Sequence, residues 1–500
     1  MSVDYLLAID QGTTSTRAIV FDAQGLAIAT AQRELPQIFP HPGWVEHDPE
    51  TIWRDCVEVC RDAVVKSGIA PASLAGIGIT NQRETTVLWD KATGIPIYNA
   101  IVWQDRRTAP LCARLKSEGM EAKVTAKTGL LLDPYFSATK IAWLLDNIEG
   151  ARARAESGAI IFGTIDSYLV WQLTGGARHV TDVTNASRTM LFDIFQQDWD
   201  SELLEIFNIP RAILPDVFDN TAMFGETRSE PFNTAVPILG MVGDQQSAAI
   251  GQACLSPGMI KSTYGTGCFA LLNTGKTVVG STNKLLTTIA YRFDSSTRFA
   301  LEGSIFVAGA AVQWLRDGLG IIRNSAETSS LAETADPKSG VYLVPAFTGL
   351  GAPYWDSGAR ANIQGLTRDS GKEEIARATL ESIGFQTRDL FQAMAADGAA
   401  EPTTLRVDGG LSKNDWAMQF LADILAIPVE RPVITEITAL GAAYLAGLQA
   451  GIYTDLKNIS ENWAQDRFFE PSMSTDERDQ RYSGWCDAVQ RTRTSIIHDA

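Results

Sequence analysis

Two turns rich in glycine and threonine constrain the fold of this chain more than any other feature. The first, DQGTTS at residues 10–15, and the second, YGTG at residues 264–267, each separate two short runs of apolar and β-branched residues. Such an arrangement predicts a β-hairpin at each place. A further turn at residues 23–25 predicts a third strand beside the first hairpin.

The two predicted hairpins stand about half the chain apart, which indicates a duplicated unit. A chain of 500 residues is also too long for one ordinary core. Helical patterns at residues 370–394 and 436–451 accompany the predicted strands, and the first of them begins with a possible capping box from Ser370 to Glu373. We therefore predict an α/β protein of two duplicated domains, residues 1–250 and 251–500, with hairpins that face a central cleft.

Composition excludes several classes of protein. The net charge of −17 argues against a nucleic-acid partner, which requires a basic face. No apolar run is long enough for a membrane span, and Asp4 stands where a secretion signal would be basic, so we expect a cytoplasmic protein. Six cysteines without a Cys-x-x-Cys pair argue against zinc or disulfides, and we expect Cys56 and Cys60 to be reduced, partly buried thiols on one helix face.

The turn at residues 10–15 has the chemistry of a phosphate site. Asp10 can hold a hydrated Mg²⁺, Gly12 permits close backbone approach, and the following hydroxyls can donate to phosphate oxygens. An ordinary hairpin with a polar tip is the alternative for this turn taken alone. The second hairpin strengthens the phosphate interpretation, as does a third glycine turn after the predicted strand 405–408, where a base or ribose could lie against bare backbone.

Asp244 is the second carboxylate of interest. It follows a predicted strand that begins near residue 236 and precedes a helix of small residues, so the strand end would present it to a cleft. A carboxylate in that place, with Gln245 beside it, suits general-base work on a hydroxyl. The alternative is a structural N-cap of the helix.

Longer segments carry a resemblance to a known family. They are residues 8–15, 42–49, 79–86, 99–104, 133–137, 243–246, 264–269, 344–355 and 407–410, with wider signatures at 135–147 and 361–381. Together they resemble the FGGY family of carbohydrate kinases, within the actin-like ATPase superfamily, over nearly the whole chain. The resemblance implies two duplicated actin-like (ribonuclease H-like) ATPase domains, and the segments 81–84 and 133–135 are similar to those of members that act on glycerol.

The same resemblance implies a polyol site and a nucleotide site. The residues implied for the polyol are Arg83, Glu84, Trp103, Tyr135, Asp244, Gln245 and Phe269. The residues implied for the nucleotide are Thr13, Thr14, Ser15, Arg17, Thr266, Gly309, Gln313, Gly410 and Asn414, with Asp10 holding Mg²⁺ through water. We expect the polyol site and the first phosphate hairpin in residues 1–250, and the second hairpin and the adenosine site in residues 251–500. Several buried polar partners and an aromatic wall suit a small triol.

The activity implied is ATP-dependent phosphorylation of glycerol to sn-glycerol 3-phosphate, by in-line transfer with Asp244 as general base. ATP or ADP and Mg²⁺ are the expected cofactors, and a homodimer or homotetramer is expected from the same likeness. Two alternatives stay open. One is a kinase for another polyol or sugar, and the other, from a different class, is a non-metabolic actin-like ATPase that has no need of the polyol residues.

Two controls known in the family are not expected in their usual form. Residues 232–235 lack the glycine and arginine of a loop that binds an inhibitory sugar bisphosphate. In other members a phosphorylated histidine occupies the same region, and none of His41, His47, His179 or His498 lies there. Strong inhibition by millimolar fructose 1,6-bisphosphate would contradict this prediction.

Overall fold

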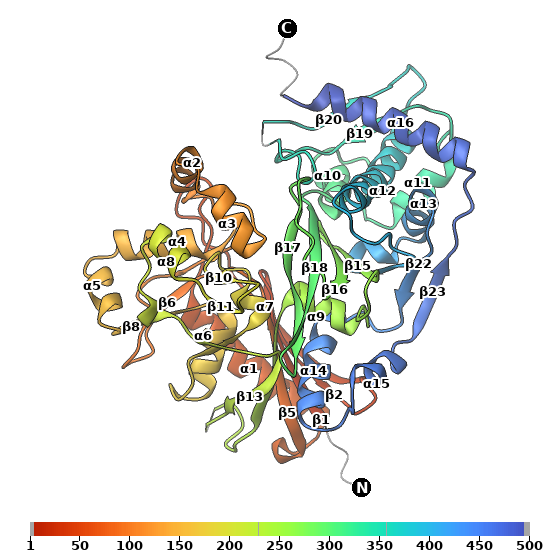
Figure 1. Cartoon of the computed structure of the whole chain (residues 1–500). Coiled ribbons are helices and arrows are strands. Elements are labelled where there is room, and N and C mark those ends of the chain that lie inside the picture. The colour runs from red at the N-terminus through yellow and green to blue at the C-terminus, as the bar shows by residue number, and fades with distance from the viewer. Residues whose placement is uncertain (1–4, 229, 357, 495–500) are drawn as a thin grey trace. The chain divides into compact units, whose positions relative to one another are not determined.

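The computed structural model describes residues 5–228, 230–356 and 358–494 (Figure 1). His498, considered above, lies outside the described residues. By internal packing the chain forms two compact units. Unit 1 comprises Met1–Leu255, Thr287–Phe299 and Glu436–Trp463, and unit 2 comprises Ser256–Leu286, Ala300–Thr435 and Ala464–Ala500.

The main sheet of unit 1 has, within the described residues, six strands in the order β13-β14-β5-β1-β2-β3. Their bounds are β1 Tyr5–Gln11, β2 Ser15–Phe21, β3 Ala27–Glu34, β5 Leu74–Asn81, β13 Thr221–Glu226 and β14 Pro237–Gly243. β1 pairs antiparallel with β2 and parallel with β5, which in turn pairs parallel with β14. The predicted first hairpin and its third strand, β3, are confirmed.

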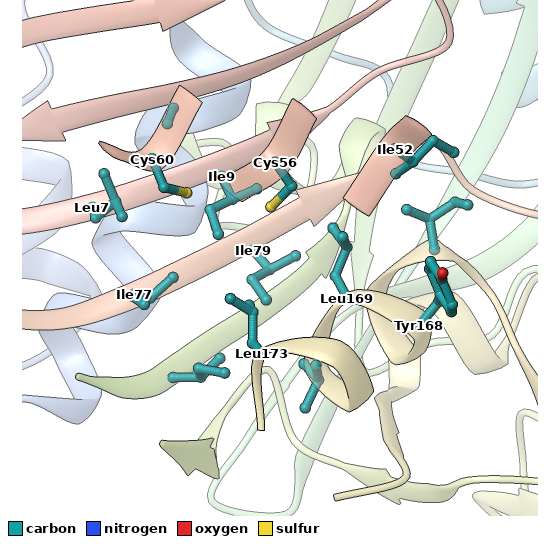
Figure 2. Close-up of a cluster of buried hydrophobic side chains, with 14 of the residues drawn as sticks. Leu7, Ile9, Ile52, Cys56, Cys60, Ile77, Ile79, Tyr168, Leu169 and Leu173 are labelled. Carbon is teal, nitrogen blue, oxygen red and sulfur yellow. The ribbon is translucent and has the colours of Figure 1, made fainter. Parts of the chain in front are cut away.

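Strand β1 lies inside this sheet, and both of its faces are covered. On one face, Ile9 of β1 and Ile79 of β5 pack with α1 (Pro49–Ser67) and α6 (Ile165–Leu173) in one apolar cluster (Figure 2). A strand buried on both faces reads as a continuous apolar run, which explains why residues 5–9 lack polar alternation. The chemistry of β1 is therefore confined to its end, at Asp10.

Two cysteines of α1 belong to the same core. Cys56 and Cys60 are one helical turn apart and completely buried, and both point toward the apolar side chains of β1 and β5 (Figure 2). A side-chain contact with Cys56, together with burial, raises the pKa of the Cys60 thiol well above its ordinary value. All six cysteines of the chain are free thiols. The position of this pair on one helix face, expected from its spacing, is confirmed, but the expected partial burial is wrong, because both thiols are completely buried in the core.

The opposite face of the sheet is covered by helices of small residues. A Cβ added to Gly78 of β5 would lie 2.0 Å from the carbonyl oxygen of Ala442 in α14 (Ile437–Gln449). A Cβ added to Gly441 would lie 2.0 Å from the carbonyl oxygen of Ser247 in α9 (Asp244–Gly251). Glycine is needed at both positions because the backbones approach so closely. The prediction that residues 436–451 form a tightly packed helix is confirmed.

The second large sheet, most of whose strands belong to unit 2, repeats the strand pattern of the main sheet of unit 1. In the described part of the chain its order is β17-β18-β16-β15-β21-β22-β23. The bounds are β15 Ile260–Tyr264, β16 Cys268–Gly275, β17 Leu286–Phe293, β18 Ser296–Ile305, β21 Leu405–Asp408, β22 Val429–Pro432 and β23 Gln465–Phe469. β15 pairs antiparallel with β16 and parallel with β21, as β1 does with β2 and β5. The predicted second hairpin and the duplication are confirmed.

The helices of unit 2 build a second core against this sheet. They are α10 Gly309–Asp317, α11 Glu327–Thr334, α12 Lys372–Ala396, α13 Asp415–Leu425 and α16 Thr475–Thr492. The predicted start of α12 is wrong by one residue, because the N–H of Gly371 donates to the carboxylate of Glu374 at 2.8 Å. The Ser370 hydroxyl instead accepts from the N–H of Thr367 at 2.9 Å, within the preceding turn.

Shorter elements complete the two units. In unit 1 these include β4 Glu46–His47, β6 Val87–Asp90, β7 Ala100–Ile101, β8 Ile160–Gly163, β9 Val180–Asp182, β10 Phe192–Asp193, β11 Asp198–Trp199, β12 Asp216–Phe218, α2 Ala109–Ser117, α3 Glu121–Thr128, α4 Ser137–Asn147, α5 Ala151–Glu156, α7 Val183–Ala186, α8 Ser201–Phe207 and α15 Leu456–Glu461; unit 2 adds β19 Tyr342–Val344 and β20 Asn362–Gln364. Among the helices of the described residues, none has the length and apolar character that crossing a membrane requires.

Candidate active site

The first hairpin tip brings a carboxylate and an arginine together. Asp10 at the end of β1 lies opposite Arg17 of β2 in the strand register. The N–H of Gly12 donates to the carbonyl of Ser15 at 2.9 Å and closes the tip. Arg17 also donates to Glu436, just before α14, with 2.6 Å between Nη1 and Oε2. The tip therefore combines backbone donors, hydroxyls and a held guanidinium, which are the groups that bind phosphate.

Asp10 has an unusual acidity. Burial raises its pKa to about 6, because a charge at the strand end is poorly solvated. Arg17 opposes this rise, while the negative charges of Asp244 and Glu436 add to it. Two carboxylates from distant parts of the sequence thus act electrostatically on the end of β1. A cation placed there would relieve the repulsion among the three acidic groups.

A buried arginine organises the predicted polyol residues. The Nε of Arg83 lies 3.1 Å from Oδ1 of Asp244, and its Nη1 donates to Oε1 of Gln246 at 3.3 Å. The Arg83 and Glu84 side chains are each 2% exposed, whereas that of Asp244 is 30% exposed. One end of the ion pair is therefore fixed in the protein, and the carboxylate at the other end is accessible to a substrate.

Asp244 does not cap its helix. The N-cap of α9 is Gly243, and Asp244 is the first helical residue, with Oδ1 accepting from the N–H of Gln245 at 2.7 Å. The alternative of a purely structural N-cap at Asp244 is therefore wrong. A carboxylate in the first turn of a helix is stabilised by the partial positive charge of the helix terminus.

Aromatic rings stand beside these polar groups. The rings of Trp103 and Tyr135 have centroids 5.5 Å apart and planes inclined at 60°. Both side chains are partly exposed. The indole N–H of Trp103 donates to the hydroxyl of Thr13 at 2.9 Å, so this aromatic wall is attached to the first hairpin tip. An apolar wall next to several hydrogen-bonding groups suits a small polyol.

A buried network of side chains, to which no sequence motif assigned a role, supports the first hairpin tip. Gln37 donates to the carbonyl of Thr13 at 2.6 Å, and Gln82 donates to Gln11 at 2.9 Å and to the carbonyl of Gly12 at 3.2 Å. His47 connects the two amides, with Nε2 2.9 Å from Gln37 Oε1 and Nδ1 3.3 Å from Gln82 Nε2. Burial lowers the pKa of His47 to about 4, so the imidazole is neutral. The only sequence signal for this network was that segments 42–49 and 79–86 resemble those of the FGGY family.

The second hairpin tip is held by backbone rather than by side chains. The N–H of Gly265 donates to the carbonyl of Gly267 at 2.9 Å. The N–H of Gly309 donates to the carbonyl of Gly265 at 2.9 Å, and the carbonyl of Thr266 accepts from both Ala308 (2.9 Å) and Ala310 (3.0 Å). The start of α10 thereby fixes the tip, and the Thr266 hydroxyl stands on an exposed residue. Phe269, predicted for the polyol, is a partly buried residue of β16 in unit 2.

The remaining predicted nucleotide residues lie elsewhere in unit 2. Gln313 is exposed on α10, and Gly410 is exposed at the start of the 3-10 helix Gly410–Lys413. The side chain of Asn414 caps α13 by accepting from the N–H of Ala417 at 3.0 Å. Gly409 has φ +88°, and an added Cβ would lie 2.5 Å from the carbonyl oxygen of Tyr264. This contact explains the glycine at 409 and packs the third turn against the second hairpin, whereas a Cβ added to Gly410 would meet nothing within 4 Å.

The residues around Asp10 fit a magnesium ion held largely by water. No group of three or more acidic, histidine or cysteine side chains in the described residues is arranged as a metal cage. Mg²⁺ retains several waters and commonly takes one or two carboxylates together with substrate phosphates. The raised pKa of Asp10 shows a carboxylate whose negative charge is poorly compensated by the protein, which is the donor such an ion requires.

Comparison with protein families decides the wider identity. The N-terminal domain of the FGGY family of carbohydrate kinases matches residues 5–251, and the C-terminal domain of that family matches residues 260–450. The chain belongs to the FGGY family of carbohydrate kinases. The predicted fold class, two duplicated α/β domains of the actin-like ATPase type, is thereby confirmed.

Individual FGGY relatives are similar over almost their whole length. A glycerol kinase of Ectopseudomonas mendocina is 60% identical over 490 residues, which is 98% of this chain and 99% of that protein. A glycerol kinase of Roseobacter denitrificans is 59% identical, again over 98% of this chain and 99% of the relative. The crystal structure of Plasmodium falciparum glycerol kinase with ADP matches with a TM-score of 0.93 and 39% identity, covering 98% of both chains.

Proposed function

We propose that this protein is a glycerol kinase, an ATP:glycerol 3-phosphotransferase that produces sn-glycerol 3-phosphate and ADP. The observation that carries the proposal is the fixed ion pair of Arg83 with the accessible carboxylate of Asp244, next to buried Glu84 and the Trp103–Tyr135 wall. Relatives about 60% identical over nearly their full length are named glycerol kinase, which supports the same assignment.

Glycerol is recognised by groups that match its three hydroxyls. Arg83 donates, Glu84 accepts, and Tyr135 and Gln245 can do both, while the indole of Trp103 and the ring of Phe269 meet the carbon chain. A site built for hydroxyls rejects analogues that lack them, because its buried polar groups would stay unpaired. The nearly complete burial of Arg83 and Glu84 makes that penalty large.

The reaction is a single in-line transfer. Asp244 accepts the proton of a terminal hydroxyl as that oxygen forms a bond to the γ-phosphorus, and the bond from this phosphorus to the β–γ bridging oxygen breaks, which releases ADP. Arg83 orients the Asp244 carboxylate through the 3.1 Å contact. The proton on Asp244 then passes to solvent, to which this side chain is open.

Charge on the phosphates is offset by both hairpin tips. Thr13, Thr14, Ser15 and Arg17 act from the first tip and Thr266 from the second, while Gly309, Gln313, Gly410 and Asn414 serve the nucleotide. Asp10 would hold Mg²⁺ through water, and that ion supplies electrostatic stabilisation of the phosphoryl oxygens. Most catalysis in such transfers comes from positioning and electrostatics, which fits a site made of fixed donors.

The decisive experiment is a coupled ADP-release assay with ATP and Mg²⁺ across a panel of polyols and sugars. We expect strong stimulation by glycerol and weak stimulation by erythritol or xylulose. A better response to one of these larger substrates would support the alternative of another polyol or sugar kinase. ATP hydrolysis that is indifferent to every polyol would instead support a non-metabolic actin-like ATPase and reject the proposal.

The proposal also covers the pathway, the cellular location, the oligomeric state and the regulation of the enzyme. We place the enzyme in glycerol catabolism in the cytoplasm, as a homodimer or homotetramer, without control by a sugar bisphosphate or a phosphorylated histidine. Light scattering tests the oligomeric state, and titration with fructose 1,6-bisphosphate tests the absence of control by a sugar bisphosphate. The assignment of the polyol site to residues 1–250 and of the adenosine site to residues 251–500 is part of this proposal.

A further inference from the structure

Arg188, which no sequence motif singled out, lies completely buried behind the polyol residues of unit 1. It follows α7, and its Nε donates to Oε1 of Glu84 at 2.6 Å. The central carbon of its guanidinium lies 5.6 Å from the centre of the Tyr135 ring and 5.2 Å from that of Phe136. A single side chain thus contacts two of the residues assigned to glycerol.

The backbone at Glu84 is unusual. Its φ is +63°, a region that residues with a side chain rarely adopt. The N–H of Thr85 donates to the carbonyl of Arg83 at 2.7 Å, so Glu84 is the central residue of a γ-turn with positive φ, a rare and strained form. Strained residues persist where their surroundings fix them, and they gather at functional sites. This turn therefore needs external support.

Hydrogen bonds from three side chains support the turn, and the Nε of Arg83 lies 3.9 Å from Oε1 of Glu84. The hydroxyl of Ser137 donates to the carbonyl of Glu84 at 3.0 Å, and that of Thr86 donates to the same carbonyl at 3.1 Å. Arg188 holds the other end of the residue, the carboxylate. The backbone and the side chain of Glu84 are thus fixed separately.

The chemistry of arginine suits this place. A planar guanidinium can donate to a carboxylate in its plane while its faces lie against aromatic rings. A lysine ammonium would keep the charge but lose the planar fork and the stacking surface. The carboxylate and the Tyr135 ring are therefore oriented relative to one another by a group that does not itself need to touch substrate.

We propose that Arg188 is a positioning residue that sets the selectivity for a small polyol, by holding the Glu84 carboxylate and the Tyr135 ring in one arrangement. The inference rests on the function proposed above and deepens it. Hydrogen bonds to polyol hydroxyls depend on the placement of both groups, and loss of Arg188 releases both at once. The contacts described for Arg188 are with Glu84, Tyr135 and Phe136, so its loss should affect the KM for glycerol more than the KM for ATP.

The test compares Arg188→Met and Arg188→Lys with the unmodified enzyme. We expect Arg188→Met to raise the KM for glycerol about tenfold or more, because the buried carboxylate loses a charged donor, while the KM for ATP stays within about twofold of its original value. The ratio of kcat/KM for glycerol to that for erythritol falls. Arg188→Lys gives an intermediate ratio. A lower melting temperature with unchanged KM values and an unchanged ratio would overturn the proposal in favour of a structural role.

Two less disruptive serine variants form a matched pair of test and control. Ser137→Ala removes a hydroxyl from the Glu84 carbonyl and should raise the KM for glycerol a few-fold. Ser187→Ala removes a buried hydroxyl that donates to the Thr184 carbonyl at 2.8 Å rather than to Glu84, and should leave the KM unchanged. If Arg188→Met does not fold, Arg188→Lys is the test. If neither variant folds, an unchanged KM for glycerol in Ser137→Ala overturns the proposal that glycerol binding depends on the supported placement of Glu84.

The two proposals fail in different ways. If the unmodified enzyme shows no turnover stimulated by glycerol, the proposed function is wrong, and the variants need not be compared. If the unmodified enzyme phosphorylates glycerol and the Arg188 variants keep both its KM and its preference over erythritol, only the inference about Arg188 is wrong.

Discussion

The two hairpins have the same strand pattern, but their tips differ in charge and in the groups that hold them. In each, an antiparallel pair is joined on one side by a parallel strand, β5 beside β1 and β21 beside β15. The first tip carries Asp10 and Arg17 and rests on a network of side-chain amides and an imidazole. The second tip is bound by the backbone at the start of α10. The two hairpins share one strand pattern, and the charged residues of the tips belong to the first.

This difference indicates a division of labour. A carboxylate with a raised pKa costs folding stability when it is ionised, and a protein retains such a group where function needs it. The second tip, residues 264–267, has no carboxylate and no basic side chain, so we expect it mainly to position a ligand. The first hairpin should therefore determine catalytic rate and pH dependence, and the second should determine nucleotide affinity.

The largest expected effect is that of Asp10→Asn at the charged tip. Loss of the carboxylate should lower kcat by about 100-fold or more, because the proposed mechanism uses Asp10 to position the cation at the phosphoryl oxygens. Steady-state assays over a range of Mg²⁺ concentrations measure this. Asp62→Asn, on the exposed face of α1, should show no loss. Near-normal activity of Asp10→Asn would contradict the assignment of catalytic rate to the first hairpin tip.

The same variant should be more stable than the parent at alkaline pH. The folded pKa of Asp10 is about 6 against an ordinary value of 3.8, so the folded state binds the proton more tightly than the unfolded state does. The contribution of this group to stability is therefore fully present below pH 3.8 and is lost as the pH rises through about 6. We expect Asp10→Asn to raise the free energy of unfolding by about 1–2 kcal/mol at pH 8, after allowance for the partial exposure of Asp10, and to change it little near pH 4. Thermal melts at both pH values test the sign.

The hairpins themselves were predictable from the sequence, because a turn rich in glycine and threonine between apolar runs is a local signal. The carboxylates at strand ends were predictable for the same reason. The placement of residues 436–463 with unit 1 was not, because it depends on packing between distant segments, such as Ala442 against Gly78. Arg188 and His47 were also missed. Each is a lone polar residue whose partners come from other elements, so no local pattern marks it.

The pH profile gives the next effect in size. Protonation of Asp10 should lower kcat/KM about tenfold per pH unit below a pKa of about 6. Glu436→Gln should move this acid limb to lower pH, because the Glu436 charge raises the pKa of Asp10. Profiles of kcat/KM for ATP between pH 5 and about 9 provide the measurement. If the acid limb of the kcat/KM profile stays at the same pH in Glu436→Gln, then a group other than Asp10 controls that limb.

At the second tip, Gly309→Ala should weaken nucleotide binding without changing the pH profile. An added Cβ would lie 2.5 Å from the carbonyl oxygen of Gly265, so the tip or the start of α10 must shift. We expect the KM for ATP to rise about tenfold, with kcat affected less. Gly280→Ala is the matched control, because its added Cβ meets nothing within 4 Å. A fall in kcat alone would contradict the assignment of affinity to this tip.

The smallest effects are expected from the network beneath the first tip, and they separate hydrogen bonding from charge. His47 is neutral, donates to Gln37 and accepts from Gln82. A glutamine amide can replace both contacts, so His47→Gln should change kcat and the KM for ATP by less than about threefold. His47→Leu takes away the donor to the Gln37 side-chain oxygen and one acceptor of the Gln82 amide, and it should raise the KM for ATP several-fold, because Gln37 and Gln82 hold the carbonyls of the tip.

Stability gives a second test of the His47 network. The pKa of His47 is lowered from 6.5 to about 4, so its stabilising contribution is present above pH 6.5 and is lost as the pH falls toward 4. His47→Gln should therefore lose less melting temperature than the parent between pH 7 and about 5. Equal losses in the two proteins would mean that the imidazole is protonated without cost, and that the first tip does not depend on a neutral support.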